Sequence, residues 1–320
     1  MLLPYQSAAL FIRGLDYRLG AVRRDLGELS ADKLLLGTVK DLSAVGYCYN
    51  FGLGRDESLL MLAASPLSNA LQYANEPRGL VFQHCFAESA VVRYDVNETD
   101  IAVRNRYFPA EVMRQLELDN LPYFCSFASG CAGFISVLIA AGGLFRSSDE
   151  RPVICVMADS MPPGVPYDMS RERILVSDHS SAFVMGREQH GYQLLGVNYS
   201  SITRIAVPFV EIVRRTVQMV EELATSLDLD LSRRDVAIHY PNIFPDTWRM
   251  VTRYLKIPNV EHVIDGMRDR AHCMASDSVI SLAKLHRGNE GRIHVVVNYG
   301  IGLHLGTCFL KEVAQTGADI

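Results

Sequence analysis

The 320-residue sequence predicts an α/β protein, and three observations support that class. Short runs of β-branched and apolar residues, bounded by turn residues, recur along the chain and are typical of buried strands. Longer stretches with apolar residues at helical spacing lie between these runs. The composition, 49% hydrophobic and 21% charged residues, is that of a globular protein with a sizeable core. Strands that alternate with helices favour buried mixed sheets covered by helices.

The individual elements follow from these patterns. Strands are predicted at 79–83, 153–157, 181–185, 236–238 and 293–298. Helices are predicted at 56–64, 209–227, 247–255 and 277–286, the first of them beginning at the cap-like residue Asp56. A further strand, YQLLGVNYS, follows Gly191. We therefore expect a seam near Gly191, which separates an N-terminal half, 1–190, from a C-terminal half, 191–320.

Charge and cysteine content exclude several classes of protein. The net charge is -5 and basic residues do not gather among aromatic ones, so nucleic-acid binding is not expected. Seven cysteines without a CxxC pair argue against a zinc site or a thioredoxin-like motif, and we expect no metal and no redox cofactor. The start, MLLPYQSAALFIRG, lacks the pattern of a signal peptide, which favours a cytoplasmic protein with reduced thiols.

One apolar stretch raises the question of a membrane span. No charged residue occurs between Phe127 and Phe145. The stretch contains four glycines and two serines and has no aromatic belt, features that favour a helix buried in a protein core. We predict a buried helix and no membrane partner.

The same stretch, which begins SFASGCAGFISVL, holds a candidate nucleophile. If Ser129 and Gly130 form a turn and a helix begins at Cys131, the thiol lies at the positive end of the helix dipole. This placement lowers a thiol pKa and makes the reactive thiolate available near neutral pH. A buried packing cysteine fits the same residues, because free cysteines are among the most buried residue types.

Three later segments supply candidate partners for Cys131. His239 follows a short strand in IHYPN, with Asn242 three residues on, and can serve as general base or oxyanion donor. Asp277 precedes a helix and either caps it or orients a histidine. His272 is a second candidate for that histidine. The glycines Gly300, Gly302 and Gly306 in YGIGLHLGTCFLK allow close approach of the backbone to a substrate, or simply form a tight turn.

Taken in this order, the segments resemble the ketoacyl-ACP synthase III branch of the thiolase superfamily. SGCAGF resembles the nucleophile segment of that family, HYPN its His-x-x-Asn segment and YGIGLHLGTCFLK its C-terminal glycine turn. The resemblance implies a five-layered αβαβα thiolase fold with two similar halves. It also implies that Cys131 accepts the acyl group, that His239 is the catalytic histidine, and that the backbone N–H groups of Cys131 and Ile301 form an oxyanion hole. Asn242, Gly300 and Gly302 would support that site.

The sequence departs from the condensing members at one informative place. These members carry an Asn in a Gly-Asn segment before the last catalytic helix, whereas this sequence reads HCMASDSVISL there. It resembles more closely the small subgroup with a Cys-His-Asp set, in which Asp277 is the third member. A carboxylate near an enolate oxygen repels the charge that decarboxylation develops, whereas a carboxylate bonded to a histidine raises the basicity of that histidine.

The resemblance and this charge argument predict an acyltransferase that passes an acyl group through an acyl-cysteine to a hydroxyl or amine acceptor, in secondary metabolism. Two alternatives stay open. One is a decarboxylative ketoacyl synthase of the synthase III type, and the other is a degenerate, non-enzymatic thiolase-fold subunit that pairs with an active one.

The same family resemblance carries expectations about the acyl donor and about the partners of the protein. The early segment LSAVGYCYNFGLGRDES lacks the Trp with which relatives hold coenzyme A, which favours a carrier-protein thioester over acyl-CoA. Arg249, Arg253 and Lys256 share one helix face on which an acidic carrier protein could dock, although a merely solvated face fits them equally well. The resemblance also implies a homodimer that continues the central sheets across a two-fold axis.

Overall fold

The computed structural model describes residues 1–93, 99–118, 120–127, 129–145, 149–169, 173–202, 207–286, 288–300 and 304–313. Its strands are β1 (Leu2–Pro4), β2 (Leu10–Leu19), β3 (Val22–Asp25), β4 (Tyr49–Gly52), β5 (Gly79–Gln83), β6 (Val91–Arg93), β7 (Asn105–Tyr107), β8 (Tyr123–Ser126), β9 (Val153–Asp159), β10 (Asp168–Met169), β11 (Ile174–Leu175), β12 (His179–Gly186), β13 (Tyr192–Ser201), β14 (Val236–His239), β15 (Glu261–Val263), β16 (Ile293–Gly300) and β17 (His304–Glu312).

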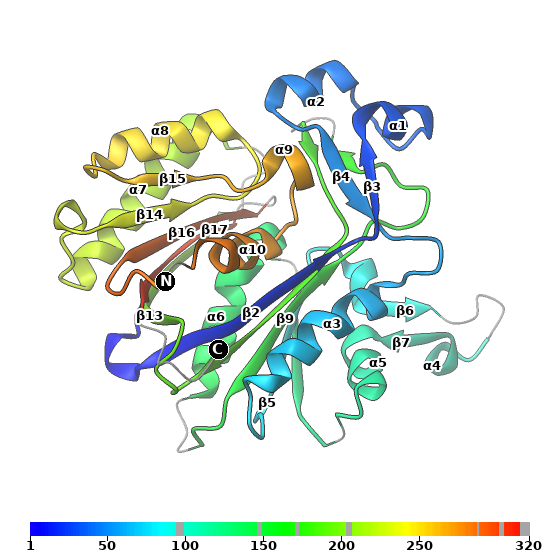
Figure 1. The fold of residues 1–320 in the computed structure, drawn as a ribbon, viewed down its shortest axis with the longest axis horizontal. Helices are drawn as coiled ribbons and strands as arrows, with labels where there is room; N and C mark the ends of the chain where they lie inside the picture. The colour runs from blue at the N-terminus through cyan, green and yellow to red at the C-terminus, as the bar shows by residue number, and fades with distance from the viewer. Residues whose placement is uncertain are drawn as a thin grey trace.

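The helices are α1 (Leu26–Ala31), α2 (Val39–Val45), α3 (Leu59–Gln72), α4 (Ile101–Arg104), α5 (Phe108–Gln115), α6 (Gly133–Leu144), α7 (Phe209–Ser226), α8 (Pro245–Leu255), α9 (Met267–Arg270) and α10 (Ser276–Leu285). Short 3-10 turns occur at η1 (Gln6–Ala8), η2 (Ala87–Ala90), η3 (Gly130–Ala132) and η4 (Leu231–Arg233). Figure 1 shows these elements in chain order.

The strand order contains the same five-strand pattern twice. The first run is β2-β12-β9-β5-β8 and the second is β13-β17-β16-β14-β15, and the two runs join through the β2–β13 pair. In each run the first two pairings are antiparallel and the last two are parallel. The helix that enters β9 is α6 and the helix that enters β16 is α10, so these two helices occupy equivalent places in the repeated pattern.

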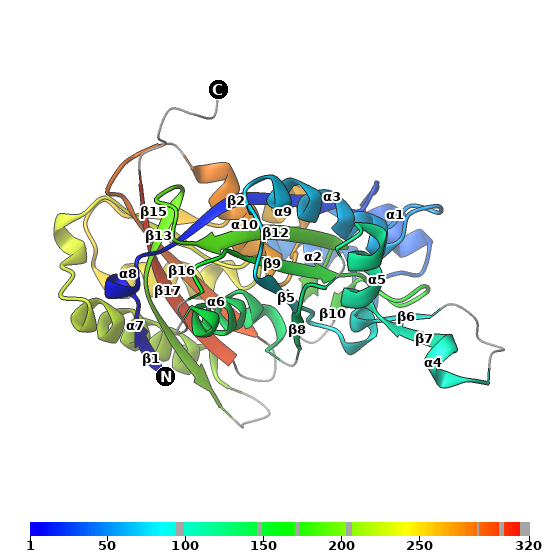
Figure 2. The ribbon, with the colours of Figure 1, turned by 90° about the horizontal axis from the view of Figure 1, so that it is seen from below.

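Strand residues alternate between two cores, which produces a layered molecule. Val153, Cys155 and Met157 of β9 pack with α6 and α10. The intervening Ile154 and Val156 pack with α3 and α5, as the two-residue period of a strand requires. The second run of strands packs against α7 and α8. Figures 1 and 2 show α6 and α10 at the centre, with α3 and α5 toward one end and α7 and α8 toward the other.

The α/β class and the five-layered αβαβα arrangement predicted from the sequence are confirmed. All six predicted strands occur in the structure, each within two residues of its expected ends. The first predicted helix starts later than expected, because Ser58 and not Asp56 is its N-cap and accepts the backbone N–H of Met61. The apolar stretch around Cys131 forms α6, which has 12 residues. Over the described ranges, every helix is too short or too polar to cross a membrane.

Candidate active site

Cys131 lies in the 3-10 turn that leads into α6, at the N-terminal end of that central helix. The preceding Gly130 adopts a left-handed backbone with φ of 51°, which favours glycine and turns the chain from β8 into the helix. The Cys131 side chain is only 4% exposed, and its Sγ lies 3.9 Å from Sδ of Met274 in the loop before α10. The predicted position of this thiol at a helix start is therefore present in the structure.

Gly300, at the end of β16, lies directly against the backbone that carries Cys131. A Cβ atom at Gly300 would lie 2.4 Å from the carbonyl oxygen of Ser129 and 3.4 Å from the nitrogen of Cys131. A side chain at this position would therefore displace the nucleophile segment. Ile301 and Gly302, the other predicted members of this turn, lie outside the described residues.

Asp277, in the first turn of α10, is buried and uses both carboxylate oxygens. Its Oδ2 accepts Nδ1–H of His272 at 2.5 Å and the backbone N–H of Asn242 at 2.8 Å. Its Oδ1 accepts Nη1–H of Arg270 at 2.5 Å and the backbone N–H of Cys273 at 3.0 Å. The residue is not the N-cap of its helix, since Ala275 takes that position. Asp277 instead anchors the loop that carries His272.

The histidine that Asp277 orients is His272. The side chain is 1% exposed, and its backbone is held by a hydrogen bond to the carbonyl of Leu175 and a parallel bridge to Val176. Because Nδ1 of His272 faces the carboxylate, Nε2 lies on the opposite side of the ring. Nε2 makes no hydrogen bond of regular geometry within the described residues. Cys131 acts on His272 through its charge, and the long or poorly aligned geometry is common in sites without bound substrate.

The charges of this group support a thiolate and an imidazolium. A hydrogen bond from Cys85 and the charge of His272 outweigh burial and lower the pKa of Cys131 to about 5. Burial opposes the charged form of His272, but the charges of Cys131 and Asp277 raise its pKa to about 10. Burial likewise opposes ionisation of Asp277, yet Arg270 and His272 hold its pKa below the usual range. These shifts together favour a negative Cys131, a positive His272 and a negative Asp277 near neutral pH.

The predicted contact between His239 and Asp277 is wrong. Nδ1 of His239 pairs with Oγ of Ser281 at 2.6 Å, and Nε2 pairs with Nδ1 of His294 at 2.8 Å. His294 in turn contacts Oε2 of Glu312 at 3.1 Å. Burial, His294 and Arg292 lower the pKa of His239 well below its usual value. Both hydrogen-bonding positions of the ring are occupied, because the strand register turns this side chain toward α10 and β16.

Asn242 is buried behind His272, where it holds the surrounding loops together. Its Nδ2 donates to the carbonyl oxygens of Asp265 at 2.9 Å and Ala271 at 2.8 Å, and its backbone carbonyl accepts the hydroxyl of Tyr47 at 2.7 Å. These bonds fix the loop that precedes His272. The supporting place predicted for Asn242 is consistent with this geometry.

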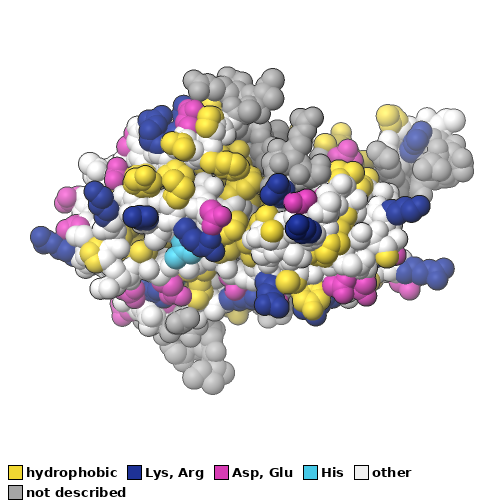
Figure 3. All heavy atoms as spheres, turned by 90° about the horizontal axis from the view of Figure 1, so that it is seen from above, with side chains coloured by type: hydrophobic (Ala, Val, Ile, Leu, Met, Phe, Trp, Pro, Cys, Tyr) yellow, Lys and Arg dark blue, Asp and Glu magenta, His cyan; other side chains and the backbone are white. Residues whose placement is uncertain are grey.

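The predicted basic face lies on α8. Arg249, Arg253 and Lys256 are all exposed, and Arg249 forms an ion pair with Asp246 on the same helix. Figure 3 views the molecule from the side of α8 and α2, where Lys and Arg side chains are scattered among apolar and acidic ones. The charges on this face do not form a concentrated patch.

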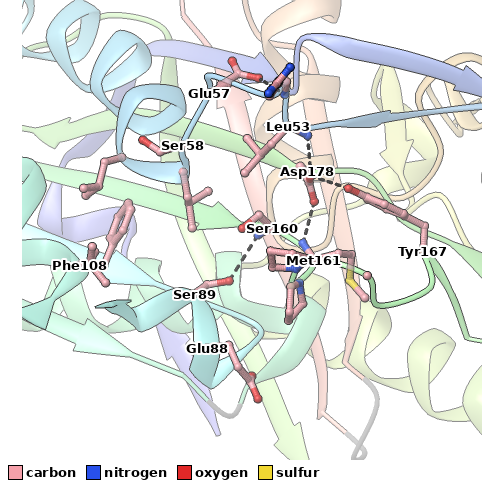
Figure 4. Close-up of a pocket in the computed structure, with 18 of the residues that line it drawn as sticks. Leu53, Glu57, Ser58, Glu88, Ser89, Phe108, Ser160, Met161, Tyr167 and Asp178 are labelled. Carbon is pink, nitrogen blue, oxygen red and sulfur yellow. Dashed lines mark hydrogen bonds between the residues drawn. The ribbon is translucent and has the colours of Figure 1, made fainter. Parts of the chain in front are cut away.

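A cavity of about 580 Å³ lies beside the loop that follows β9. In Figure 4, the Asp178 carboxylate accepts hydrogen bonds from three connecting segments, through the N–H groups of Leu53 and Met161 and the hydroxyl of Tyr167. Tyr167 and Met161 also belong to the core cluster that contains Cys131. The wall of the cavity is thus continuous with the packing around the nucleophile.

Sequence reasoning ranked His272 behind His239 and did not identify Arg270, Met274 or Cys85. The spacing from His272 to Asp277, five residues across the start of an apolar helix, was an available signal. Cys85 had no comparable signal, because it approaches Cys131 only through the pairing of β5 with β8.

Comparison with solved structures shows the thiolase-type fold of the 3-oxoacyl synthase III structures. The 3-oxoacyl-[acyl-carrier-protein] synthase III from Aquifex aeolicus matches with a TM-score of 0.73 at 17% identity, covering 94% of this chain and 99% of its own. ChlB3, an acyltransferase, matches with a TM-score of 0.75 at 16% identity, covering 95% and 98%. OleA from Xanthomonas campestris matches with a TM-score of 0.72 at 15% identity, covering 97% and 99%.

These similarities extend over nearly the whole chain and establish its fold. No family model and no curated protein sequence matches the chain.

Proposed function

We propose that the protein is an acyltransferase that carries an acyl group from a thioester, through an acyl-Cys131 intermediate, to a hydroxyl or amine acceptor. The observation that carries this proposal is the buried set of Cys131, His272 and Asp277 at the start of the two central helices. A thiolate paired with an imidazolium, which a carboxylate orients, is the arrangement that covalent acyl transfer requires.

In the first step, the Cys131 thiolate attacks the carbonyl carbon of the donor thioester. The tetrahedral oxyanion is stabilised by the N–H of Cys131 and by the positive end of α6; the N–H of Ile301 is a second candidate donor. The C–S bond to the donor breaks, and Nε2–H of His272 protonates the leaving thiolate. The products of this step are acyl-Cys131, a free donor thiol and a neutral His272.

In the second step, the changed charge of Cys131 makes His272 a base. Acylation removes the thiolate, which is one of the two charges that raise the pKa of His272, so the imidazole is neutral when the acceptor arrives. Nε2 takes the proton of the hydroxyl or amine while that atom attacks the acyl carbon. The C–S bond to Cys131 breaks, and the thiolate and imidazolium are restored.

The rival function is decarboxylative condensation, which the fold shared with 3-oxoacyl synthases favours. Decarboxylation of a malonyl thioester develops an enolate that needs neutral or positive donors at its oxygen. His239, which the sequence suggested for that role, has both ring nitrogens engaged elsewhere. A single histidine backed by an ionised carboxylate suits proton removal from an acceptor better.

The donor and the assembly are part of the proposal. We infer a carrier-protein thioester as the donor, with acyl-CoA as the alternative, and α8 with Arg249, Arg253 and Lys256 as the docking helix. The homodimer implied by the sequence is supported by β8, which ends the strand order and has a described strand on only one of its edges. Phe124 on that strand is 51% exposed, and Phe127 just beyond it is 58% exposed.

Intact-mass spectrometry tests the acyl intermediate. The protein is incubated with a panel of acyl thioesters of carrier protein, coenzyme A and N-acetylcysteamine. We expect a mass increase equal to one acyl group, which is absent in Cys131→Ala and retained in Cys125→Ala, where a thiol on β8 is removed instead. An adduct that persists in Cys131→Ala would refute the assignment of the nucleophile.

A second incubation separates transfer from condensation. The acyl-enzyme is given either malonyl carrier protein or a mixture of alcohols and amines. Ester or amide products with no release of carbon dioxide support acyl transfer. Release of carbon dioxide together with a β-ketoacyl product would establish condensation in its place.

A further inference from the structure

The sulfur atom of Cys131 is covered by the side chain of Met274. Met274 lies in the loop between α9 and α10, after His272 and before Asp277. Its Sδ lies 3.9 Å from Sγ of Cys131, which is van der Waals contact. The side chains of Met274 and Cys131 are only 2% and 4% exposed. A thioether is therefore packed directly against the atom that must form a bond with the acyl group.

The backbone of this loop is strained at two residues, one on either side of His272. Met274 has a φ of 47°, the left-handed conformation that residues other than glycine rarely adopt. Ala271 has a φ of 54° and a ψ of -151°, a combination used almost only by glycine. Strain of this kind persists only where the surrounding contacts impose it. The direction in which the Met274 side chain leaves the loop is therefore imposed by the fold.

Asp277 supplies part of the contacts that hold this loop. Its Oδ1 accepts the backbone N–H of Cys273 at 3.0 Å, and its own backbone N–H donates to the carbonyl oxygen of Met274 at 3.3 Å. The backbone N–H of Ser276 donates to the carbonyl oxygen of Cys273 at 2.9 Å. The carboxylate that orients His272 thus also helps to set the turn that carries Met274.

The space around the two sulfur atoms is apolar and filled. Cys131 and Met274 belong to one packed cluster, which also contains Tyr47, Val176 and Ile243. The cavity of about 580 Å³ beside the loop that follows β9 is lined by other residues, and Cys131 is not among them. An acyl group bonded to Sγ of Cys131 therefore needs space that a side chain now occupies.

Met274 is the side chain best suited to make this space. The hydroxyl of Tyr47 donates to the carbonyl oxygen of Asn242 at 2.7 Å, and Nδ1–H of His272 donates to Asp277 at 2.5 Å, so both rings are fixed. A methionine side chain is unbranched, has three rotatable bonds and adapts to irregular spaces. Rotation of the thioether can therefore open a narrow space beside Sγ of Cys131 without movement of the backbone.

We propose that Met274 is a specificity-determining residue, which limits the size of the acyl group that Cys131 can carry and favours short, unbranched, apolar acyl groups. The proposal rests on the function proposed for Cys131. A short straight chain can lie along the rotated thioether, whereas a branch on the carbon next to the carbonyl group meets it. Burial of a charged or strongly polar acyl group in this apolar cluster would be costly.

Acylation by a matched series of thioesters tests this limit. Acetyl, butyryl, isobutyryl and octanoyl thioesters of N-acetylcysteamine are supplied separately, and intact-mass spectrometry gives each rate of acylation. In Met274→Ala, we expect the isobutyryl and octanoyl rates, each divided by the acetyl rate, to rise by about tenfold or more, the scale of a few methylene groups in an apolar pocket. Met274→Leu keeps the side-chain volume and is expected to keep the parent ratios. A general loss of reactivity changes all four rates together and leaves the ratios unchanged.

Alkylation gives a second measurement that does not require acyl transfer. The Cys131 thiolate displaces iodide from iodoacetamide or from its bulkier N-benzyl derivative, forming a thioether, and peptide mass spectrometry gives both rates. We expect Met274→Ala to raise the rate of the N-benzyl reagent relative to iodoacetamide. Met274→Gly, which suits a left-handed backbone, takes the place of the alanine variant if that variant does not fold. Met219→Ala removes a buried methionine of α7 and is the control.

The outcomes distinguish this proposal from the proposed function. Unchanged acylation ratios in folded Met274→Ala or Met274→Gly overturn the role of Met274, and so does an equal change of the ratios in Met219→Ala. A parent protein that no thioester acylates overturns the acyl-transfer function instead. The alkylation ratio then decides whether Met274 restricts access to Cys131, and an unchanged ratio overturns that restriction as well.

Discussion

Asp277 has two tasks at the scale of single residues. Its bonds to Arg270 and to the N–H groups of Asn242 and Cys273 order the loop, and its bond to Nδ1 of His272 orients the ring so that Nε2 lies on the side away from the carboxylate. The side chains of Arg270 and Asp277 are both almost fully buried, so the positive charge of Arg270 compensates the negative charge of Asp277 where water cannot. The carboxylate therefore does not contact the substrate, and its effect on the reaction passes through His272.

Asp277→Asn separates these tasks, because the amide keeps the shape of the carboxylate and loses its charge. We expect acyl transfer to the acceptor to fall by about 100-fold or more, the usual scale for a misoriented general base. Acyl-Cys131 is expected to accumulate, since the second step depends on the basicity of His272. Single-turnover kinetics with intact-mass detection measures both steps.

An Asp277→Asn variant that transfers acyl groups at the parent rate would contradict the role of the carboxylate. A variant that gains condensation with malonyl carrier protein would instead favour the ketosynthase alternative. Asp32→Asn, at the exposed C-terminal end of α1, is a matched control for the same loss of charge away from the site.

The residue scale is also where the sequence was least predictive. Cys131 and Asp277 were identified because a helix start and its preceding turn are local features. His239 and His272 both follow apolar segments, and which of them faces Cys131 depends on distant backbone contacts. The bridge of His272 to Val176 and the engagement of His239 by His294 involve residues far apart in the chain. No local pattern specifies such pairings.

At the scale of elements, the site is formed where two equivalent helices begin. α6 presents Cys131 and α10 presents Asp277, and both helices pack in the central core with Phe134, Val279 and Leu282. The end of β16 closes this junction through the contact of Gly300 with the Cys131 segment. Elements from both runs of strands are therefore needed to hold the nucleophile in place.

Gly300→Ala tests this junction. The added Cβ would overlap the carbonyl oxygen of Ser129, so the turn before Cys131 must shift. We expect the rate of Cys131 acylation to fall by about tenfold or more, because a misplacement of about 1 Å costs on the order of 100-fold in such sites. The rate of mass increase with an acyl thioester measures the effect.

Gly143→Ala is the control for this prediction. Gly143 lies in α6, and a Cβ there meets no atom within 4 Å. The variant is expected to keep the parent rate and to be slightly more stable, because alanine favours a helix by about 1 kcal/mol over glycine. Equal acylation rates in Gly300→Ala and the parent would show that β16 does not support the nucleophile.

The elements themselves were largely predictable. Strands such as β5 and β9 are short and apolar throughout, and that pattern identifies buried strands directly. The predicted start of α3 was too early, because both Asp56 and Ser58 are residues that cap helices and the N-cap is Ser58. The repeated strand order was not visible in the sequence, because direction and pairing of strands depend on long-range contacts.

At the scale of the whole molecule, β8 leaves the sheet unfinished. It ends the strand order with one edge unpaired by any described strand, and it carries the exposed aromatic residues Tyr123 and Phe124. An exposed apolar edge strand is a template for pairing with another chain. The proposed homodimer would cover this edge and continue the sheet across the two-fold axis.

Phe124→Lys is expected to weaken this association. The charge would be buried between two copies of β8, so the dimer should dissociate at concentrations where the parent remains dimeric. Size-exclusion chromatography with light scattering measures the mass. Tyr254→Lys replaces an aromatic residue of similar exposure on α8 and is the control. A parent protein that is monomeric at all concentrations would contradict the proposed assembly.

The central claim is that His272, and not His239, works with Cys131. The direct measurement compares acylation of Cys131 in His272→Gln and His239→Gln by intact mass, using the thioester that best acylates the parent and after thermal unfolding has shown that each variant is folded. We expect a loss of about 100-fold or more in His272→Gln and a rate within about threefold of the parent in His239→Gln, whose ring is engaged by Ser281 and His294. A folded His272→Gln variant that acylates at the parent rate, alongside an inactive His239→Gln variant, would contradict the account.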